Sequence, residues 1–235
     1  PAVGELLRLN TSISGTGCDS VSYRHGRVMA VTEKAIVVAD TANPRTANPN
    51  DVLTESDFRS FGESFDTLVW KIGTENFGEP SDIDKNGRVI IFFTRAVNEL
   101  NPPGVDVFTA GFFWSGDLFP EEATARAEAC PGGNQAEMFY MLTADPAGEA
   151  GRQFSAAEIR ELTIPVIAHE YQHLINAGRR LWVNEASAFE AVWLNEGLSH
   201  VAEELLYFAV TGLGPGSDIG YDEVTGAPGG AAAFN

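Results

Sequence analysis

The sequence predicts an α+β fold, a small sheet packed against a helical part, from two observations. Short apolar runs typical of strands dominate the first half of the chain, whereas long segments with helical spacing dominate the end. We therefore expect residues 1–150 to form a mainly β lobe with one long helix. Residues 151–235 should form a helical lobe, and the two lobes should make one domain. The expected strands are residues 27–31, 35–39, 88–94, 105–114 and 136–142.

The strand predictions depend on apolar content and on the turns beside each run. The runs 27–31 and 35–39 are separated by three residues, 32–34, and are therefore expected to pair as a hairpin. The segment 41–51, with its prolines and asparagines, is a predicted loop. Residues 88–94 hold an unbroken apolar run, which is typical of a strand buried on both faces.

The first predicted helix starts at Thr54, because Thr54 and Asp57 have the spacing of a capping box. Apolar residues then recur at helical spacing over about five turns. The helix is expected to end near Gly73 or Gly78.

A second helix is expected over 155–176, starting from the capping box of Ser155 and Glu158. Pro165 has no amide hydrogen, so we expect it to kink or divide this helix, with Thr163 capping the second part. A last helix is expected over 188–210.

The composition excludes some classes of function. Lys and Arg number 15 against 33 Asp and Glu, a net charge of −18, which repels phosphate backbones and anionic membranes and so argues against nucleic-acid binding. No segment has the roughly 20 apolar residues of a membrane span. Cys18 and Cys130 fit a disulfide of an exported protein, and two buried thiols fit as well. The chain opens at Pro1 and closes with a Gly- and Ala-rich segment, 211–235, so we expect a longer native chain. We also expect a monomer.

The sharpest motif is His169-Glu170-Tyr171-Gln172-His173, an H-E-x-x-H match. Residues four apart lie on one face of a helix, so both imidazoles can bind one metal ion. Glu170 is rotated about 100° from His169, which suits a base that takes a proton from a metal-activated water. An apolar stretch precedes the motif, so these polar side chains are expected in the interior, where they need partners.

Catalytic zinc needs a third protein ligand, for which Glu196 is the first candidate. It follows His173 by 23 residues, enough for a turn and a returning helix, and shares a helix face with other ionisable residues. Those residues are His200, Glu203 and Tyr207. The rival ligands are Glu185, Glu190 and His200.

These motifs resemble the gluzincin pattern of thermolysin-like peptidases and, more closely, the hyicolysin family of secreted bacterial neutral metallopeptidases. The resemblance is carried by the segments 82–91, 139–142, 168–176 and 193–203. It implies a zincin-like core, zinc at His169, His173 and Glu196, Glu170 as general base, and a protein or peptide substrate. It also implies an extracellular or cell-surface bacterial protein.

The chain departs from the thermolysin-like pattern after the third ligand. The aspartate expected four residues on is replaced by His200, so support for a zinc histidine must come from His200, Glu203 or the backbone. No residue is assigned to stabilise the transition state. Residues 107–114 could be an edge strand that binds an extended peptide, and a core strand remains an equal alternative.

Two further hypotheses complete the predictions. Asp82, Asp84 and Asn86 have the spacing of the first half of a calcium loop, although Phe93 stands where the bidentate Glu belongs. A turn with side-chain hydrogen bonds is the other interpretation. The alternative to a peptidase is a non-catalytic, secreted adhesion or surface domain that retains the metal site.

Overall fold

A mixed six-stranded sheet with helices over one face forms the core of the protein. The structure is a computed structural model that describes residues 1–12, 18–46, 48–125 and 127–214. The strand order is β1-β2-β3-β4-β6-β5, in which β3, β4 and β6 are mutually parallel and the remaining pairings are antiparallel. This arrangement confirms the predicted α+β class. The strands are β1 (Leu6–Asn10), β2 (Tyr23–Val31), β3 (Ala35–Asp40), β4 (Val89–Phe93), β5 (Gly111–Phe112) and β6 (Met138–Met141).

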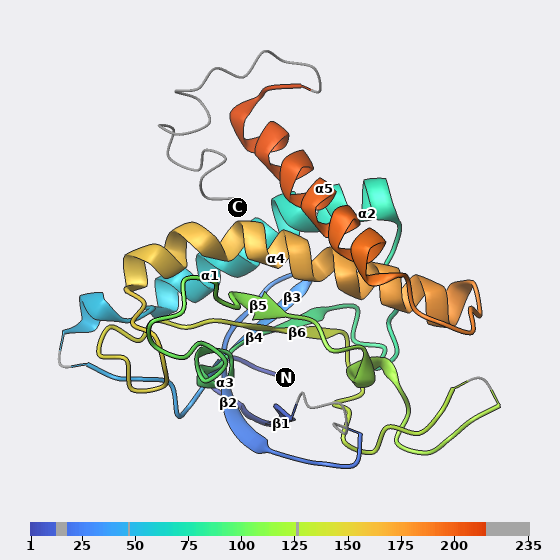
Figure 1. The fold of residues 1–235 in the computed structure, drawn as a ribbon, viewed down its shortest axis with the longest axis horizontal. Coiled ribbons are helices and arrows are strands. Elements are labelled where there is room, and N and C mark those ends of the chain that lie inside the picture. Colours follow the sequence, from blue (N-terminus) through green and yellow to red (C-terminus); the bar gives the residue numbers. More distant parts are fainter. Residues whose placement is uncertain (13–17, 47, 126, 215–235) are drawn as a thin grey trace.

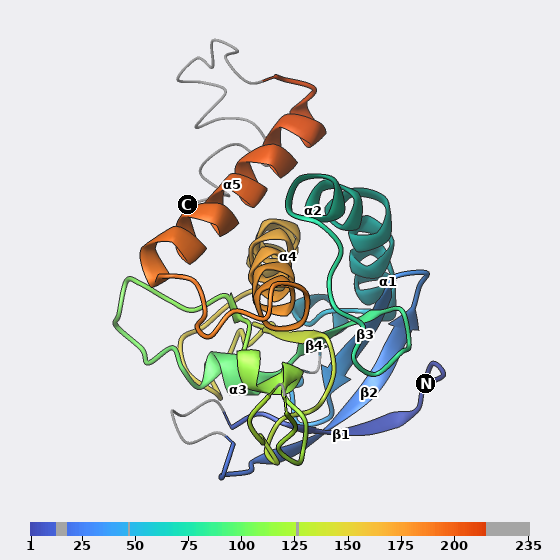
Figure 2. The ribbon, with the colours of Figure 1, turned by 90° about the vertical axis from the view of Figure 1, so that its right-hand side faces the viewer.

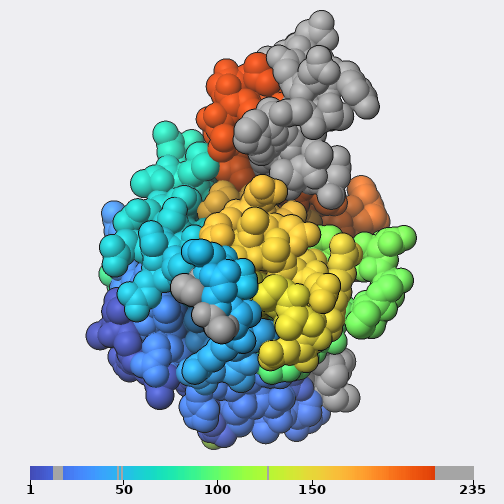
Figure 3. All heavy atoms as spheres, turned by 90° about the vertical axis from the view of Figure 1, so that its left-hand side faces the viewer, coloured from blue at the N-terminus to red at the C-terminus, as the bar shows by residue number. Residues whose placement is uncertain are grey.

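The larger helices lie together on one side of the strands (Figures 1 and 2). In Figure 1, α4 runs over the sheet, and α5 extends from beside α4 away from the strands. The beginning of α4 lies beside the segment around residue 52 (Figure 3), where Arg160 forms an ion pair with Asp57 and donates to the Val52 carbonyl. The helices are α1 (Glu55–Ser64), α2 (Trp70–Phe77), α3 (Arg95–Asn98), α4 (Ala156–Gly178) and α5 (Val192–Thr211).

Alternate side chains of the parallel strands point to opposite faces of the sheet, and both faces are buried. Val37, Ile91 and Phe139 pack into the cluster under the helices. Ile36, Phe92 and Tyr140 pack into a second cluster on the other face. The first cluster also contains Ile167 and Leu174 of α4, so residues from both sides of residue 150 share one core.

The first predicted helix begins at Thr54 as expected, but it is interrupted by a π-helical turn. Thr54 Oγ1 accepts from the amide of Asp57, and the Asp57 carboxylate accepts from the amide of Thr54, so the capping box is present. A π-helical turn, Phe65–Val69, then separates α1 from α2. The helix ends at Gly78, which has a φ of 98° that favours glycine.

The second predicted helix is one element, so of the two expected effects of Pro165, a kink or a division, the division is wrong. Ser155 and Glu158 form the predicted capping box, and α4 continues from there through Pro165 to Gly178. Thr163 does not cap a new helix, because its hydroxyl donates to the Ile159 carbonyl four residues back at 2.6 Å.

Other differences concern the ends of elements. The hairpin of β2 and β3 and the buried strand β4 are confirmed, whereas β1 was not predicted. Of the expected strand 105–114, only Gly111–Phe112 pairs, because the Asn101 side chain holds Thr109 in a loop. The predicted loop 41–51 contains a short 3-10 turn, Pro49–Asp51, and the last helix starts at Val192.

Two remaining expectations concern the disulfide and the membrane. Cys18 and Cys130 form a disulfide. Over the described ranges, none of the helices is both long and apolar enough to cross a bilayer. Of the Gly- and Ala-rich segment 211–235, the residues after Gly214 lie outside the described residues.

Candidate metal centre

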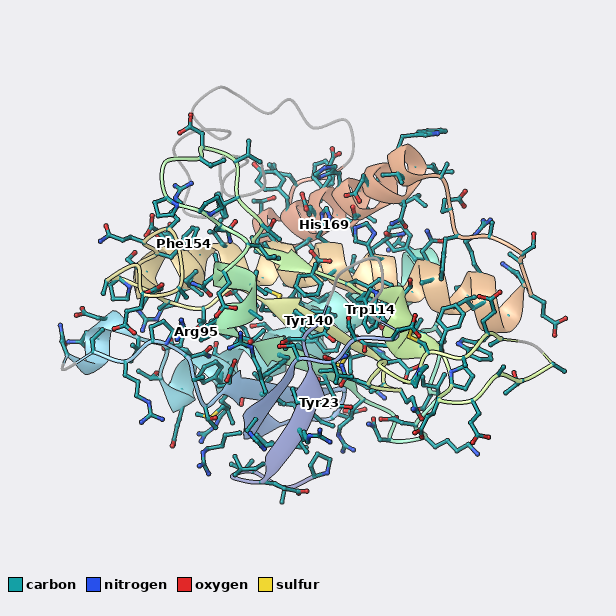
Figure 4. All side chains as sticks on the ribbon, turned by 60° about the horizontal axis from the view of Figure 1, so that its bottom comes forward. Tyr23, Arg95, Trp114, Tyr140, Phe154 and His169 are labelled. Atoms are coloured by element: carbon teal, nitrogen blue, oxygen red, sulfur yellow. A yellow bond between two sulfur atoms is a disulfide. The ribbon has the colours of Figure 1, made fainter. Side chains whose placement is uncertain are left out.

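The two histidines of the motif come from one face of α4. His169 and His173 are one helical turn apart, and their rings are nearly perpendicular with centroids 4.7 Å apart. Figure 4 shows His169 where α4 and α5 adjoin. His173 is buried, and 17% of the His169 side chain is exposed, so the pair lies at the boundary between the core and solvent.

Helix α5 brings Glu196 to both rings. Its Oε2 lies 3.4 Å from His169 Nε2 and 3.6 Å from His173 Nε2. Three ligands at zinc bond lengths of about 2.0–2.1 Å in tetrahedral geometry would be about 3.3 Å apart. Both separations of Glu196 from the imidazoles are close to this value, and all three ligand atoms lie within 4.8 Å of one another, which suits a shared zinc ion. The Glu196 side chain is 48% exposed, which leaves the site open to solvent on one side, as a catalytic metal requires.

Two of the three rival ligands, Glu190 and Glu185, lie elsewhere, whereas His200 groups with His169 and Glu203. Glu190 forms an ion pair with Arg180 at 2.8 Å. Glu185 lies between α4 and α5 in a turn, with a φ of 50°. Neither of them joins the two motif histidines in a group of potential ligands within the described residues.

Glu170 lies next to the histidines and is buried beneath the edge strand. The amide of Phe113 donates to its carboxylate, while Oε2 has no hydrogen-bond partner among the described residues. Burial raises the pKa of Glu170 to about 8. Gly111 allows this contact, since a Cβ there would be 3.2 Å from Glu170 Cγ and 2.8 Å from Val166 Cγ1.

Glu203 and His200 form a second layer behind His169. Glu203 Oε1 lies 2.5 Å from His169 Nδ1, and its Oε2 lies 3.1 Å from His200 Nδ1. Burial lowers the pKa of His169, but the hydrogen bond to Glu203 and the neighbouring carboxylates outweigh it, so the pKa is raised. Burial and the nearby His169 lower the pKa of His173.

Two residues of the predicted calcium loop lie beside a third carboxylate. Asp82 and Asp84 lie with Glu137, a residue that sequence reasoning missed, and their carboxylates are within 4.8 Å of one another. The side-chain amide of Asn86 donates to Asp84, and its oxygen accepts from the Arg88 amide. Glu137 precedes β6, and no spacing in the sequence links it to residues 82–84. Calcium binding here stays a prediction.

The comparisons with known proteins point to the same class as the site. No family model matches the chain. The chain is similar to the neutral metalloprotease ShpI of Staphylococcus hyicus, with 29% identity over 156 residues. The match covers 66% of this chain and 32% of the relative, so the chain spans about a third of that protein's length. The similarity to a metalloprotease and the His/Glu ligand group agree at the level of a metal-dependent peptidase.

Proposed function

We propose that this chain is the catalytic domain of a secreted or cell-surface bacterial metalloendopeptidase with a zincin-like core, acting as a monomer. Its zinc ion is held by His169, His173 and Glu196. The observation that carries the proposal is the convergence of these three side chains beside a fourth, buried acid, Glu170. A site with a purely structural metal would not need that acid. The disulfide supports an oxidising, extracellular environment.

Each residue has a role in peptide hydrolysis. When bound, zinc supplies a Lewis acid that lowers the pKa of a water molecule to about 7 and polarises the scissile carbonyl. Glu170 accepts the proton of the attacking water and later delivers it to the leaving amine. The burial of Glu170 under β5 keeps bulk water from competing for its carboxylate.

The edge strand provides a place for the substrate. β5 pairs with β6 on one side only, Gly111 packs against Val166 and Glu170 of α4, and the amide of Phe113, directly after β5, donates to Glu170. An extended peptide could add to this edge through main-chain hydrogen bonds, which place the scissile bond near the metal. The single pairing of β5 in the sheet favours this role over that of a core strand.

The test is the substitution Glu170→Gln, which keeps the shape of the side chain and removes its basicity. Hydrolysis of casein should fall by a factor of roughly 10² to 10⁴, the usual range for general acid–base catalysis, while zinc content stays at one per chain. Glu161→Gln, an exposed change on the same helix, is the matched control. Full activity in Glu170→Gln would exclude the proposed role of Glu170.

The non-catalytic surface domain remains the second candidate, because binding of a metal alone does not require hydrolysis. It predicts zinc in the purified protein without chelator-sensitive cleavage of casein or of a peptide library. Measuring zinc content and cleavage in the same preparation separates the two candidates.

A further inference from the structure

The geometry points to Glu203 as the positioning residue that orients His169 toward the metal, with His200 holding Glu203 in place. This inference rests on the proposed zinc site and adds to it the group that fixes one ligand. It is carried by the contact between His169 Nδ1 and Glu203 Oε1, and by the contact between Glu203 Oε2 and His200 Nδ1.

The distance between His169 and Glu203 identifies a hydrogen bond. At 2.5 Å, Nδ1 and Oε1 are closer than the separation of about 3.3 Å that two ligands of one zinc ion would have. No ion can therefore lie between them. The imidazole Nδ1 donates its hydrogen to the carboxylate, which leaves the lone pair on Nε2, the nitrogen that faces Glu196. Glu203 thus selects the tautomer of His169 that can bind a metal.

Glu203 is itself well fixed. It is buried and lies seven residues after Glu196, so both carboxylates project from one face of α5 toward α4. Its second oxygen is held by His200, whose side chain is 64% exposed at the edge of the site. One helix therefore delivers both a metal ligand and the group that orients another ligand.

A second metal site at His169, His200 and Glu203 is the competing interpretation, because these three residues also group together. It would require His169 Nδ1 and Glu203 Oε1 to separate by roughly 0.8 Å to reach the ligand spacing. The two interpretations differ in stoichiometry, since only the second predicts two metal ions per chain.

The experiment compares Glu203→Ala with Glu204→Ala, an exposed change at the next position. Zinc affinity is measured by competition with a chromophoric chelator, and the visible spectrum of the cobalt-substituted protein reports ligand geometry. We expect Glu203→Ala to weaken zinc binding by about 10- to 100-fold and to alter the cobalt spectrum. Glu204→Ala should change neither. His200→Ala should have a smaller effect, because Glu203 keeps its bond to His169.

Every outcome decides between the possibilities. If the unsubstituted protein binds no zinc, the proposed function fails, and this inference fails with it. If it binds zinc with an affinity that Glu203→Ala leaves unchanged, only the positioning role is overturned. Two ions in the unsubstituted protein and one in His200→Ala would establish the second metal site instead. Should Glu203→Ala not fold, Glu203→Gln keeps the side-chain shape and should show an intermediate loss of affinity.

Discussion

Three buried carboxyl groups share one local feature, a hydrogen bond from a backbone amide. Glu170 accepts from Phe113, Asp117 from Asn134, and Glu137 from Ile83. Burial raises the pKa of each group, to about 8 for Glu170 and about 7 for Asp117. Of these three, only Glu170 lies beside the candidate zinc ligands. Asp117 instead joins the turn after β5 to Tyr140 on the opposite face of the sheet.

Asp117 makes stability depend on pH in a predictable direction. Its pKa in the folded chain, about 7, lies above the ordinary value of 3.8, so the folded state binds this proton more tightly than the unfolded state. The stabilisation is complete below pH 4 and is lost as the pH rises toward 7. In Asp117→Asn the amide can donate to Tyr140, and its oxygen can still accept from Asn134.

We expect Asp117→Asn to match the unsubstituted protein near pH 4 and to be more stable than it at pH 8. Urea unfolding of both metal-free proteins at the two pH values measures this difference. Because the other titrating groups are shared, they cancel in the comparison. A difference in stability that does not grow with pH would contradict the assigned cause.

At the scale of elements, the close packing of β5 on α4 couples the edge strand to the proposed base. Gly111 lies where any Cβ would be 2.8 Å from Val166 Cγ1 and 3.0 Å from the Tyr140 carbonyl oxygen. Since Tyr140 belongs to the neighbouring strand, a larger residue must push β5 away from the sheet or from the helix. Either movement would shift the Phe113 amide that donates to Glu170.

Gly111→Ala is therefore expected to lower kcat/KM for a peptide substrate by at least about tenfold, since an ångström of misplacement near the chemistry can cost that much or more. Zinc affinity should stay unchanged, because the ligands lie on α4 and α5. Gly197→Ala is the matched control, as a Cβ there meets no described atom within 4 Å apart from its chain neighbours and the backbone of its own helix. Equal activity in the two variants would show that β5 tolerates the displacement.

The sequence predicted those parts of the site that depend on helical spacing. His169 and His173 are four residues apart on one helix, so their proximity is local, and Glu196 followed from the length of the connection between helices. The choice between His200 and Glu203 could not be made, because both share the face of α5 and only the packing of α5 on α4 decides which reaches His169. Glu137 and the pairing of β1 depend on contacts distant in the sequence, which no local pattern encodes.

At the scale of the whole molecule, the disulfide joins two segments that are far apart in the sequence. Cys18 lies in the connection between β1 and β2, and Cys130 lies in the long segment between β5 and β6. The Gly132 amide donates to the Cys18 carbonyl at 2.9 Å, and Asn134 and Asn10 bond to each other nearby. The disulfide thus ties the first strands to the segment that supports the edge strand.

Removing this bond should destabilise the whole fold, because it closes a sequence separation of 112 residues. A bridge of that span restricts the unfolded chain, and its loss typically costs about 2–5 kcal/mol. We expect the double substitution Cys18→Ser and Cys130→Ser to lower the free energy of unfolding by this amount in guanidinium titrations of metal-free protein. Dithiothreitol should destabilise the unsubstituted protein to a similar extent and leave the double variant unaffected. An unchanged midpoint in the double variant would mean that hydrogen bonds around Asn10 and Asn134 already hold these segments together.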